Sequence, residues 1–318
     1  MTPPARGAAL LMALLLMALV STLAAAAWSW QWRAWAVERA EREHQQAAWL
    51  LTGALDWARL IVREDGRASS LDHLGEPWAV PLQPTPLSAF LRPSRDSGDD
   101  PLEHAWLAGR IEDAQGRLNW RNLIDLTAAT PRLAPVALAA FERLYGLLDL
   151  PADELHTVAQ ALLAAWPADG QRPPRHPLPQ TLEDLQALGL SARSWAALRD
   201  HTVWLPEPTP LNLNTAGALA LRAGIEGLQA ADAQRLLLQR SQRPLDRPQA
   251  LTELLPRLGP SASLNTLSVA SRYFLVHGQL RLGTLTVQQT ALLRREGTRV
   301  DVVWLRRSPQ AFPPAATP

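Results

Sequence analysis

The sequence predicts an α+β fold. A long N-terminal helix, membrane-spanning at first and then amphipathic, packs on a small antiparallel sheet, and a large all-helical domain is inserted between the strands. Three observations predict this arrangement. An uncharged apolar run extends from Ala8 to Ala27, and the chain continues without proline to about Arg63. Period-two alternation, typical of strands, appears at 105–123 and returns at 273–306. Between these two segments the periodicity is helical.

The composition bounds the chemistry that the chain can carry. Among its 318 residues 47% are hydrophobic, the formal net charge is +1 and there is no cysteine. Disulfides, thiolate metal sites and cysteine nucleophiles are therefore excluded. Every basic residue is an arginine, which excludes a P-loop lysine and a Schiff-base lysine. A chain of this length supports one anchor and one or two globular units.

The N-terminal segment predicts a membrane anchor. Residues 1–7 end in Arg6-Gly7, and the run 8–27 that follows is long enough, at about 1.5 Å per residue, to span the roughly 30 Å of a bilayer core. Tryptophans from Trp28 to Trp35 then mark the outer boundary of the bilayer. A polar leader that ends in glycine is similar to the leader of type IV pilins and pseudopilins, which is cut after that glycine. An ordinary N-terminal anchor is the alternative.

Residues 28–65 predict a continuation of the same helix outside the membrane, with a break near Asp65-Gly66. Apolar residues recur at spacings of three and four and form one stripe. Its members are Ala47, Leu50, Leu51, Ala54, Leu55, Ala58, Ile61 and Val62. A membrane helix that continues into an amphipathic one, on which a sheet packs, is the plan of pilins. A spacer helix or a coiled-coil stalk is the alternative.

Residues 66–125 predict the first part of the sheet. A strand is predicted at 105–113, followed by a turn in which Gly116 is available for a positive φ. The segment 118–123 leads out of that turn and is assigned to the same sheet.

Residues 266–307 predict the second part of the sheet, followed by a disordered tail at 308–318. Strands are predicted at 273–282, 285–293 and 299–306, with a turn at Gly283. These strands complete the antiparallel sheet begun before the insertion.

Residues 126–265 predict the inserted helical domain. Its predicted helices lie at 136–150, 153–166, 182–188, 194–199, 219–223, 231–240 and 248–255. The phrase Leu-Asn-Leu-Asn-Thr-Ala at 211–216 resembles the helix-hairpin-helix or SAM-like family. Asn214 or Thr215 is the predicted N-cap of the helix that follows.

This second resemblance opens a DNA-binding alternative, which the local charges argue against. A DNA-binding hairpin presents bare backbone amides to a phosphate, whereas the turn here, Gly224-Ile225-Glu226-Gly227, carries a carboxylate. Between residues 211 and 257 six arginines face four acidic residues, far from the basic patch that dominates nucleic-acid affinity. We therefore expect no nucleic-acid partner.

Three features stand in a specific order along the chain. The apolar segment behind Arg6-Gly7 is followed by Gly-Glu-Pro-Trp-Ala at 75–79, and then by Gly-Arg-Ile-Glu-Asp-Ala-Gln-Gly-Arg-Leu-Asn at 109–119. In this order and spacing they resemble the K-type minor pseudopilins of type II secretion systems. The resemblance covers nearly the whole chain, up to about Ser308.

The resemblance implies a pilin-like fold with a helical insertion and a non-enzymatic role. It implies a single-pass inner-membrane protein with a cytoplasmic N-terminus and a periplasmic body. Such a protein lies at the tip of the pseudopilus, where it initiates or caps assembly for the export of folded proteins across the outer membrane. The implied partners are the I- and J-type minor pseudopilins, the major pseudopilin, the prepilin peptidase and the inner-membrane secretion platform. The alternatives are a minor pilin of a type IV pilus system and a membrane-tethered helix-hairpin-helix DNA-binding protein.

The resemblance also implies which residues matter. Arg6 and Gly7 are the residues for the peptidase, and Ala8 is the new, methylated N-terminus. Met12 occupies the fifth position after the cut, where pilins generally carry a glutamate that neutralises the terminal amine of a neighbouring subunit. A tip subunit has no neighbour above it, so Met12 fits the tip better than the shaft. Leu11 and Leu15 are the expected packing positions beside it.

No catalytic motif is present in the sequence: there is no Gly-x-Ser-x-Gly elbow, no His-Glu-x-x-His, no Walker loop and no dinucleotide fingerprint. The pair Glu112-Asp113 is interpreted as strand-end and turn chemistry rather than as an acid/base dyad. Asp96, Asp99 and Asp100 form an acidic loop cluster that lacks the spacing of a recognised calcium loop. They are the candidate ligands for calcium; no other cofactor or metal is expected.

Overall fold

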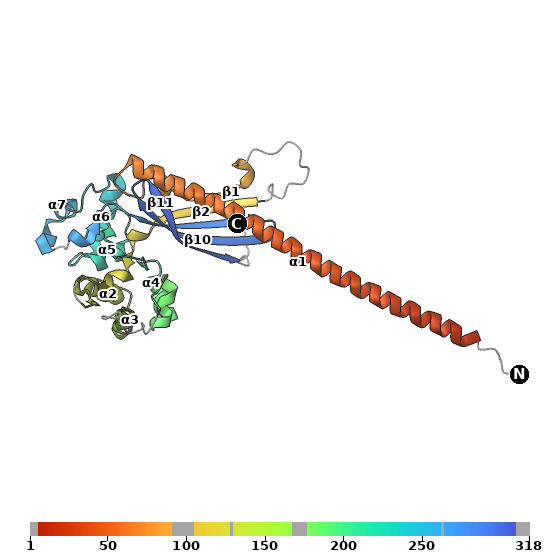
Figure 1. The fold of residues 1–318 in the computed structure, drawn as a ribbon. Coiled ribbons are helices and arrows are strands. Elements are labelled where there is room, and N and C mark those ends of the chain that lie inside the picture. Colours follow the sequence, from red (N-terminus) through yellow and green to blue (C-terminus); the bar gives the residue numbers. More distant parts are fainter. Residues whose placement is uncertain (1–5, 91–104, 128–129, 167–176, 262–263, 310–318) are drawn as a thin grey trace.

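The computed structural model of the chain describes residues 6–90, 105–127, 130–166, 177–261 and 264–309. A long helix extends from the N-terminus, and its second half lies along a sheet (Figure 1). A group of helices lies beyond the sheet, at the end of the long helix that is farthest from the N-terminus (Figure 1). The predicted combination of a long apolar N-terminal helix and an antiparallel sheet is confirmed.

The long helix α1 (Arg6–Ala68) runs without interruption through both predicted helical segments. It ends two to three residues beyond the predicted break near Asp65-Gly66. The amide of Ser69 donates to the carbonyl of Asp65 and closes a last turn. The Asp65 carboxylate accepts a bond from Arg295, and a Cβ on Gly66 would lie 2.9 Å from Cδ of Arg295. Gly66 therefore lets the last turn lie against that arginine instead of ending the helix.

The sheet is antiparallel and has the strand order β1-β2-β9-β10-β11. Its strands are β1 (Leu82–Pro86), β2 (Ala105–Asp113), β9 (Tyr273–Leu282), β10 (Leu285–Glu296) and β11 (Arg299–Pro309). The strand predicted at 105–113 is confirmed, as is its pairing with the strand that follows the insertion. Strand β1 was not predicted because Pro84 and Pro86 disfavour a strand, but prolines are tolerated at the edge that β1 occupies.

One face of the sheet is covered by α1. The predicted apolar stripe of the helix lies against it, with Leu51, Leu55, Ala58 and Val62 buried. Opposite them lie apolar side chains from all the inner strands, namely Ala105, Leu107, Phe274, Val276, Leu280, Leu282, Val287, Ala291 and Leu293. The stripe is thus the surface through which α1 packs on the sheet and not the seam of a coiled-coil stalk.

The chain between β2 and β9 forms the insert. Its longer helices are α2 (Pro135–Leu147), α3 (Ala152–Ala164) and α6 (Ala230–Gln242); the shorter ones are α4 (Ala192–Leu198), α5 (Ala218–Gly224) and α7 (Ala250–Leu254). The segment predicted at 182–188 is a 3₁₀ helix, Leu182–Leu188. The remaining elements are short 3₁₀ helices and two-residue strands, among them β3 (Leu118–Asn119), β6 (Thr202–Val203) and β7 (Leu211–Asn212).

The segment 118–123 belongs to the insert and not to the sheet, contrary to the prediction. Strand β3 pairs in parallel with β6. Trp120 is fully buried in the insert core, 4.4 Å from Phe141 between ring centroids. The preceding turn differs too, because Ala114–Gly116 is a 3₁₀ helix and Gly116 does not adopt a positive φ. Gly116 instead permits a close approach, since a Cβ there would lie 3.0 Å from Oγ1 of Thr215.

The predicted N-cap of the helix after 211–216 is also wrong, because that helix, α5, is capped by Gly217. The side chain of Asn214 accepts from the amide of Leu245 and donates to its carbonyl. The hydroxyl of Thr215 donates to Asp113. Both polar side chains are therefore used to hold separate segments together.

Candidate assembly and processing site

The predicted processing residues lie at the first turn of α1. The helix begins at Arg6 and passes through Gly7 and Ala8. Cleavage between Gly7 and Ala8, and methylation of Ala8, stay predictions.

The predicted packing residues lie on the exposed part of α1. Leu11, Met12 and Leu15 are exposed, as are the other large apolar residues from Leu10 to Leu23. Among the described residues, α1 is the one helix that is long and apolar enough to cross a membrane. Such a surface is stable only against lipid or against other apolar helices. The helix is therefore consistent with a single-pass membrane anchor.

Four exposed tryptophans follow the apolar run. Trp28, Trp32 and Trp35 recur at i, i+4 and i+7 and share one face of α1, while Trp30 lies on another. Their position directly after the run agrees with an interfacial belt, in which the indole lies at headgroup level.

Sequence reasoning missed a buried polar cluster where α1, the sheet and the insert meet. We call it the junction; it consists of Asp65, Asp72, Asp113, Asn212, Ser271 and Arg295, all of them buried. Arg295 on β10 donates to Asp65 at 2.9 Å and to both oxygens of Asp72 at 2.6 and 2.7 Å. It also donates to the carbonyl of Ser271 at 2.9 Å. One guanidinium thus links the end of α1 to the loop after it and to the end of the insert.

Asp113, the last residue of β2, is the other hub of the junction. Its carboxylate accepts from Ser271 Oγ and Thr215 Oγ1, both at 2.6 Å, and from Asn212 Nδ2 at 2.9 Å. Burial raises the pKa of Asp113 to about 6, against the opposing effect of these bonds. Burial, together with the charge of Glu76, also raises the pKa of Asp65 to about 6. The junction therefore carries more carboxylate than its cation neutralises.

The acidic groups around the junction resemble a metal site only in composition. Oxygens of Asp65, Asp72 and Glu76 lie within 4.8 Å of one another. Each of them already has donors from the chain itself: Arg295 bonds to one oxygen of Asp65 and to both oxygens of Asp72, and the amide of His73 and the indole of Trp78 both donate to Oε2 of Glu76. The candidate calcium ligands Asp96, Asp99 and Asp100 lie outside the described residues.

Glu112 and Asp113 do not form a dyad, because successive residues of a strand point to opposite faces. Glu112 lies on the face away from α1. Contact with His277, a bond from Arg110 and the charge of Arg117 hold its pKa down at about 2. The structural interpretation of this pair is confirmed.

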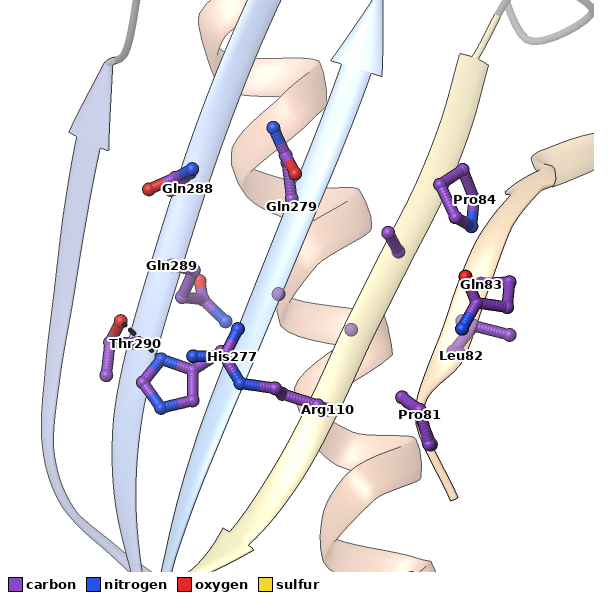
Figure 2. Close-up of a pocket in the computed structure, with 13 residues that line it drawn as sticks. Pro81, Leu82, Gln83, Pro84, Arg110, His277, Gln279, Gln288, Gln289 and Thr290 are labelled. Carbon is purple, nitrogen blue, oxygen red and sulfur yellow. Dashed lines mark hydrogen bonds between the residues drawn. The ribbon is translucent and has the colours of Figure 1, made fainter. Parts of the chain in front are cut away.

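The same open face carries a shallow groove of about 330 Å³ (Figure 2). In Figure 2, α1 lies behind the sheet, while Arg110, His277, Gln279 and Thr290 lie on the near side. His277 Nδ1 is 3.3 Å from Oγ1 of Thr290. The groove is open and polar, a geometry that suits contact with another protein better than enclosure of a small molecule.

Comparisons with known proteins show to which proteins this chain is similar. No family model matches the chain. Type II secretion system protein K of Pseudomonas aeruginosa is 27% identical over 270 residues, covering 77% of this chain and 75% of that protein. Protein K of Pectobacterium carotovorum subsp. carotovorum is 25% identical over 327 residues, covering 94% and 95%. The predicted resemblance to the K-type minor pseudopilins is confirmed. The predicted function, a minor pseudopilin of a type II secretion system, has the support of the same comparisons.

A solved structure confirms the fold. The chain is similar to one in the crystal structure of the GspK–GspI–GspJ complex from the type 2 secretion system of enterotoxigenic Escherichia coli. The TM-score is 0.65 and the identity 22%, covering 85% of this chain and 98% of the other. The two architectures therefore agree over almost the full length of the solved chain.

Proposed function

We propose that this chain is the minor pseudopilin at the tip of a type II pseudopilus, where it starts or caps assembly together with I- and J-type minor pseudopilins. The observation that carries the proposal is the place of the insert. It lies at the end of α1 farthest from the apolar segment (Figure 1). In a filament built from parallel α1 helices, a subunit added above would have to occupy that space. The insert excludes it by volume, so the chain ends the filament.

Met12 supports the same position. Between Ala8 and Val37 helix α1 contains no acidic residue. The fifth residue after the proposed cut therefore offers no carboxylate to the amine of a subunit above, and a buried amine without a partner is costly. A subunit with nothing above it needs no such carboxylate.

The proposed path to that position begins with processing. Prepilin peptidase, which recognises Arg6-Gly7, cuts after Gly7 and leaves Ala8 as the methylated N-terminus. The apolar part of α1, including Leu11 and Leu15, then packs in the inner membrane beside other minor pseudopilins, the major pseudopilin and the secretion platform. The N-terminus faces the cytoplasm and the body the periplasm. The insert, whose 211–216 phrase resembles the SAM-like family, serves as an interaction module, and the chain catalyses no reaction.

Two measurements test the proposal. Intact mass of the membrane-extracted chain is expected to show a start at Ala8 only when prepilin peptidase is present, and Gly7→Leu is expected to leave the leader uncut. An epitope on the insert, detected by immunogold labelling of pseudopili, is expected at one end of each filament. A leader that stays uncut contradicts the assignment as a pseudopilin, and label spread along the shaft contradicts the tip position.

A further inference from the structure

The insert carries a groove of its own, separate from the one on the sheet, with a volume of about 800 Å³. We call it the insert groove. It is lined by the first half of α2, by residues between 117 and 127 and by the loop 208–211. Two large apolar side chains that line it are exposed, Leu126 to 43% and Val136 to 51%. Exposed apolar side chains around a concave surface mark a binding site.

One charge in the insert groove has no counter-charge. Of the charged residues that line it, Arg117 pairs with Glu112, and Asp125 pairs with Arg132 at 2.9 Å. The third, Arg121, is only 7% exposed and forms no ion pair with any of the described residues. Burial lowers its pKa, because it disfavours the charged form. A buried charge is costly unless an opposite charge accompanies it, so Arg121 is suited to an anion from outside the chain.

The contacts of Arg121 fix its guanidinium and leave donors for a ligand. Its Nη1 donates to the carbonyl of Ile124 at 3.0 Å, and the guanidinium lies 4.7 Å over the ring of Trp166. Within the described chain, Nε and Nη2 form no hydrogen bond. A guanidinium carries five N–H donors in a planar fork that matches the two oxygens of a carboxylate. Stacking on an indole holds the plane of this fork without using its donors.

The N-terminus of α2 adds positive potential to the same groove. Its N-cap is Ala134, which has no side-chain oxygen for the free amides, and its first turn, which lines the groove, contains no acidic residue. The free amides and the dipole of a helix N-terminus attract anions. The amide of Ala134 donates to the carbonyl of Leu123 at 2.9 Å, directly before the residue whose carbonyl binds Arg121. The helix start and the guanidinium are thus anchored to the same short segment.

We propose that the insert groove binds an extended peptide segment in which a carboxylate stands beside apolar side chains. Arg121 and the start of α2 hold the carboxylate, and the apolar side chains cover Leu126 and Val136. Polar side chains such as Asn119 and Asn122 line the groove among the apolar ones, a mixture that suits a polypeptide better than a lipid chain. The inference gives a ligand chemistry to the interaction module of the proposed function and rests on that function to this extent.

The test is the binding of labelled peptides to the full chain in nanodiscs, measured by fluorescence anisotropy with empty nanodiscs as the blank. The probe is the amidated peptide Gly-Ala-Val-Asp-Val-Ala-Gly, and its matched control has asparagine in place of aspartate. A third peptide, Gly-Ala-Val-Val-Ala with a free C-terminus, distinguishes a terminal carboxylate from a side-chain carboxylate. At least one acidic peptide is expected to bind about tenfold more tightly than the asparagine peptide. Equal binding of all three peptides, or their displacement by inorganic phosphate as readily as by unlabelled peptide, would overturn the inference.

Three variants locate the site. Arg121→Met is expected to abolish the preference for the acidic peptide. Val136→Asp places a carboxylate in the first turn of α2, so it is expected to lower the affinity for that peptide about tenfold without lowering the melting temperature. Arg199→Met is the matched control, because Arg199 is an exposed arginine of the insert that also lies over an indole, 5.6 Å from Trp195, but does not line the groove. It is expected to bind as the wild type does.

A preference that survives Arg121→Met, or wild-type affinity in Val136→Asp, would overturn the inference. Either result leaves the proposed function standing, because processing at Gly7 and the position of the insert on the filament are measured without the peptides. A leader that stays uncut would instead contradict the proposed function, while peptide binding by the isolated chain would be unaffected.

Discussion

Arg295→Met tests whether the junction holds the molecule together. The guanidinium is nearly inaccessible, and it lies 4.8 Å over the ring of Phe274. Methionine keeps the apolar stem but removes the bonds to Asp65, Asp72 and the carbonyl of Ser271. Asp72, which is fully buried, then keeps the amide of Ser271 as a donor but loses its counter-charge. Removing one partner of a buried ion pair costs about 3–5 kcal/mol, and we expect a loss of about 4 kcal/mol in the free energy of unfolding.

The assay is urea unfolding of the detergent-extracted chain, followed by tryptophan fluorescence at pH 7.5 and at pH 5. The loss is expected to be smaller at pH 5, because buried carboxyl groups without a cation take up protons more readily. Arg294→Met is the control: Arg294 points to the opposite face, pairs with Glu296 at 3.3 Å and is partly exposed. It should cost less than about 1 kcal/mol. A loss below about 1 kcal/mol for Arg295→Met, or a loss independent of pH, would refute the reasoning.

Three further substitutions have expected outcomes. The folded chain holds the proton of Asp113 more tightly than the unfolded chain does between pH 3.8 and about 6, so this group makes the wild type less stable as pH rises through that window. A shift of about two pKa units corresponds to at most about 3 kcal/mol in the free energy of unfolding. Urea unfolding of Asp113→Asn at several pH values should therefore show a shallower decline of this free energy with rising pH than the wild type does. An unchanged dependence on pH would contradict the raised pKa of Asp113. Gly116→Ala should lower stability by about 1–3 kcal/mol, because the Cβ would lie 3.0 Å from Oγ1 of Thr215 and 3.2 Å from its backbone. Gly146→Ala in α2 should raise stability by about 0.5–1 kcal/mol, because nothing lies within 4 Å of its Cβ position. In thermal melts, a higher melting temperature for Gly116→Ala or a lower one for Gly146→Ala would contradict the respective expectation.

The elements that the sequence predicted are those with strong local periodicity. Strand β9 was predicted from its alternation, and from His277 onward its burial differs between the two faces; at 273–276 both faces are buried, because the insert covers the second one. The segment 118–123 shows why the local pattern was not sufficient. Its apolar residues suit a strand of the main sheet, but Leu118-Asn119 pairs with Thr202-Val203, more than eighty residues later. Packing within the insert decides with which strand this segment pairs, and the local sequence pattern carries no information about that packing.

The same distinction divides the candidate site. The exposed apolar surface of α1 was predicted because all of its residues belong to one continuous segment of the sequence. The junction was not, because its members come from the end of α1, the loop after it, β2, the insert and β10. Asp72 and Arg295 are 223 positions apart in the chain. The one local signal was the alternation Leu211-Asn212-Leu213-Asn214, in which the polar residues are as buried as the leucines.

The junction fixes the orientation of the insert relative to the sheet. The insert leaves the sheet after β2 and returns at β9, and these strands are neighbours, with Asp113 opposite Phe274. A domain joined to the body by two adjacent crossings is free to swing unless side chains hold it. Asp113 binds the insert through Asn212 and Thr215, and Arg295 ties the return segment to the end of α1. A second cluster, in which Tyr273 and Leu275 pack with Val203 and Leu205, holds the insert against the sheet. The proposed exclusion of a further subunit by volume requires this rigidity, since an insert that swung aside would leave the end of α1 free.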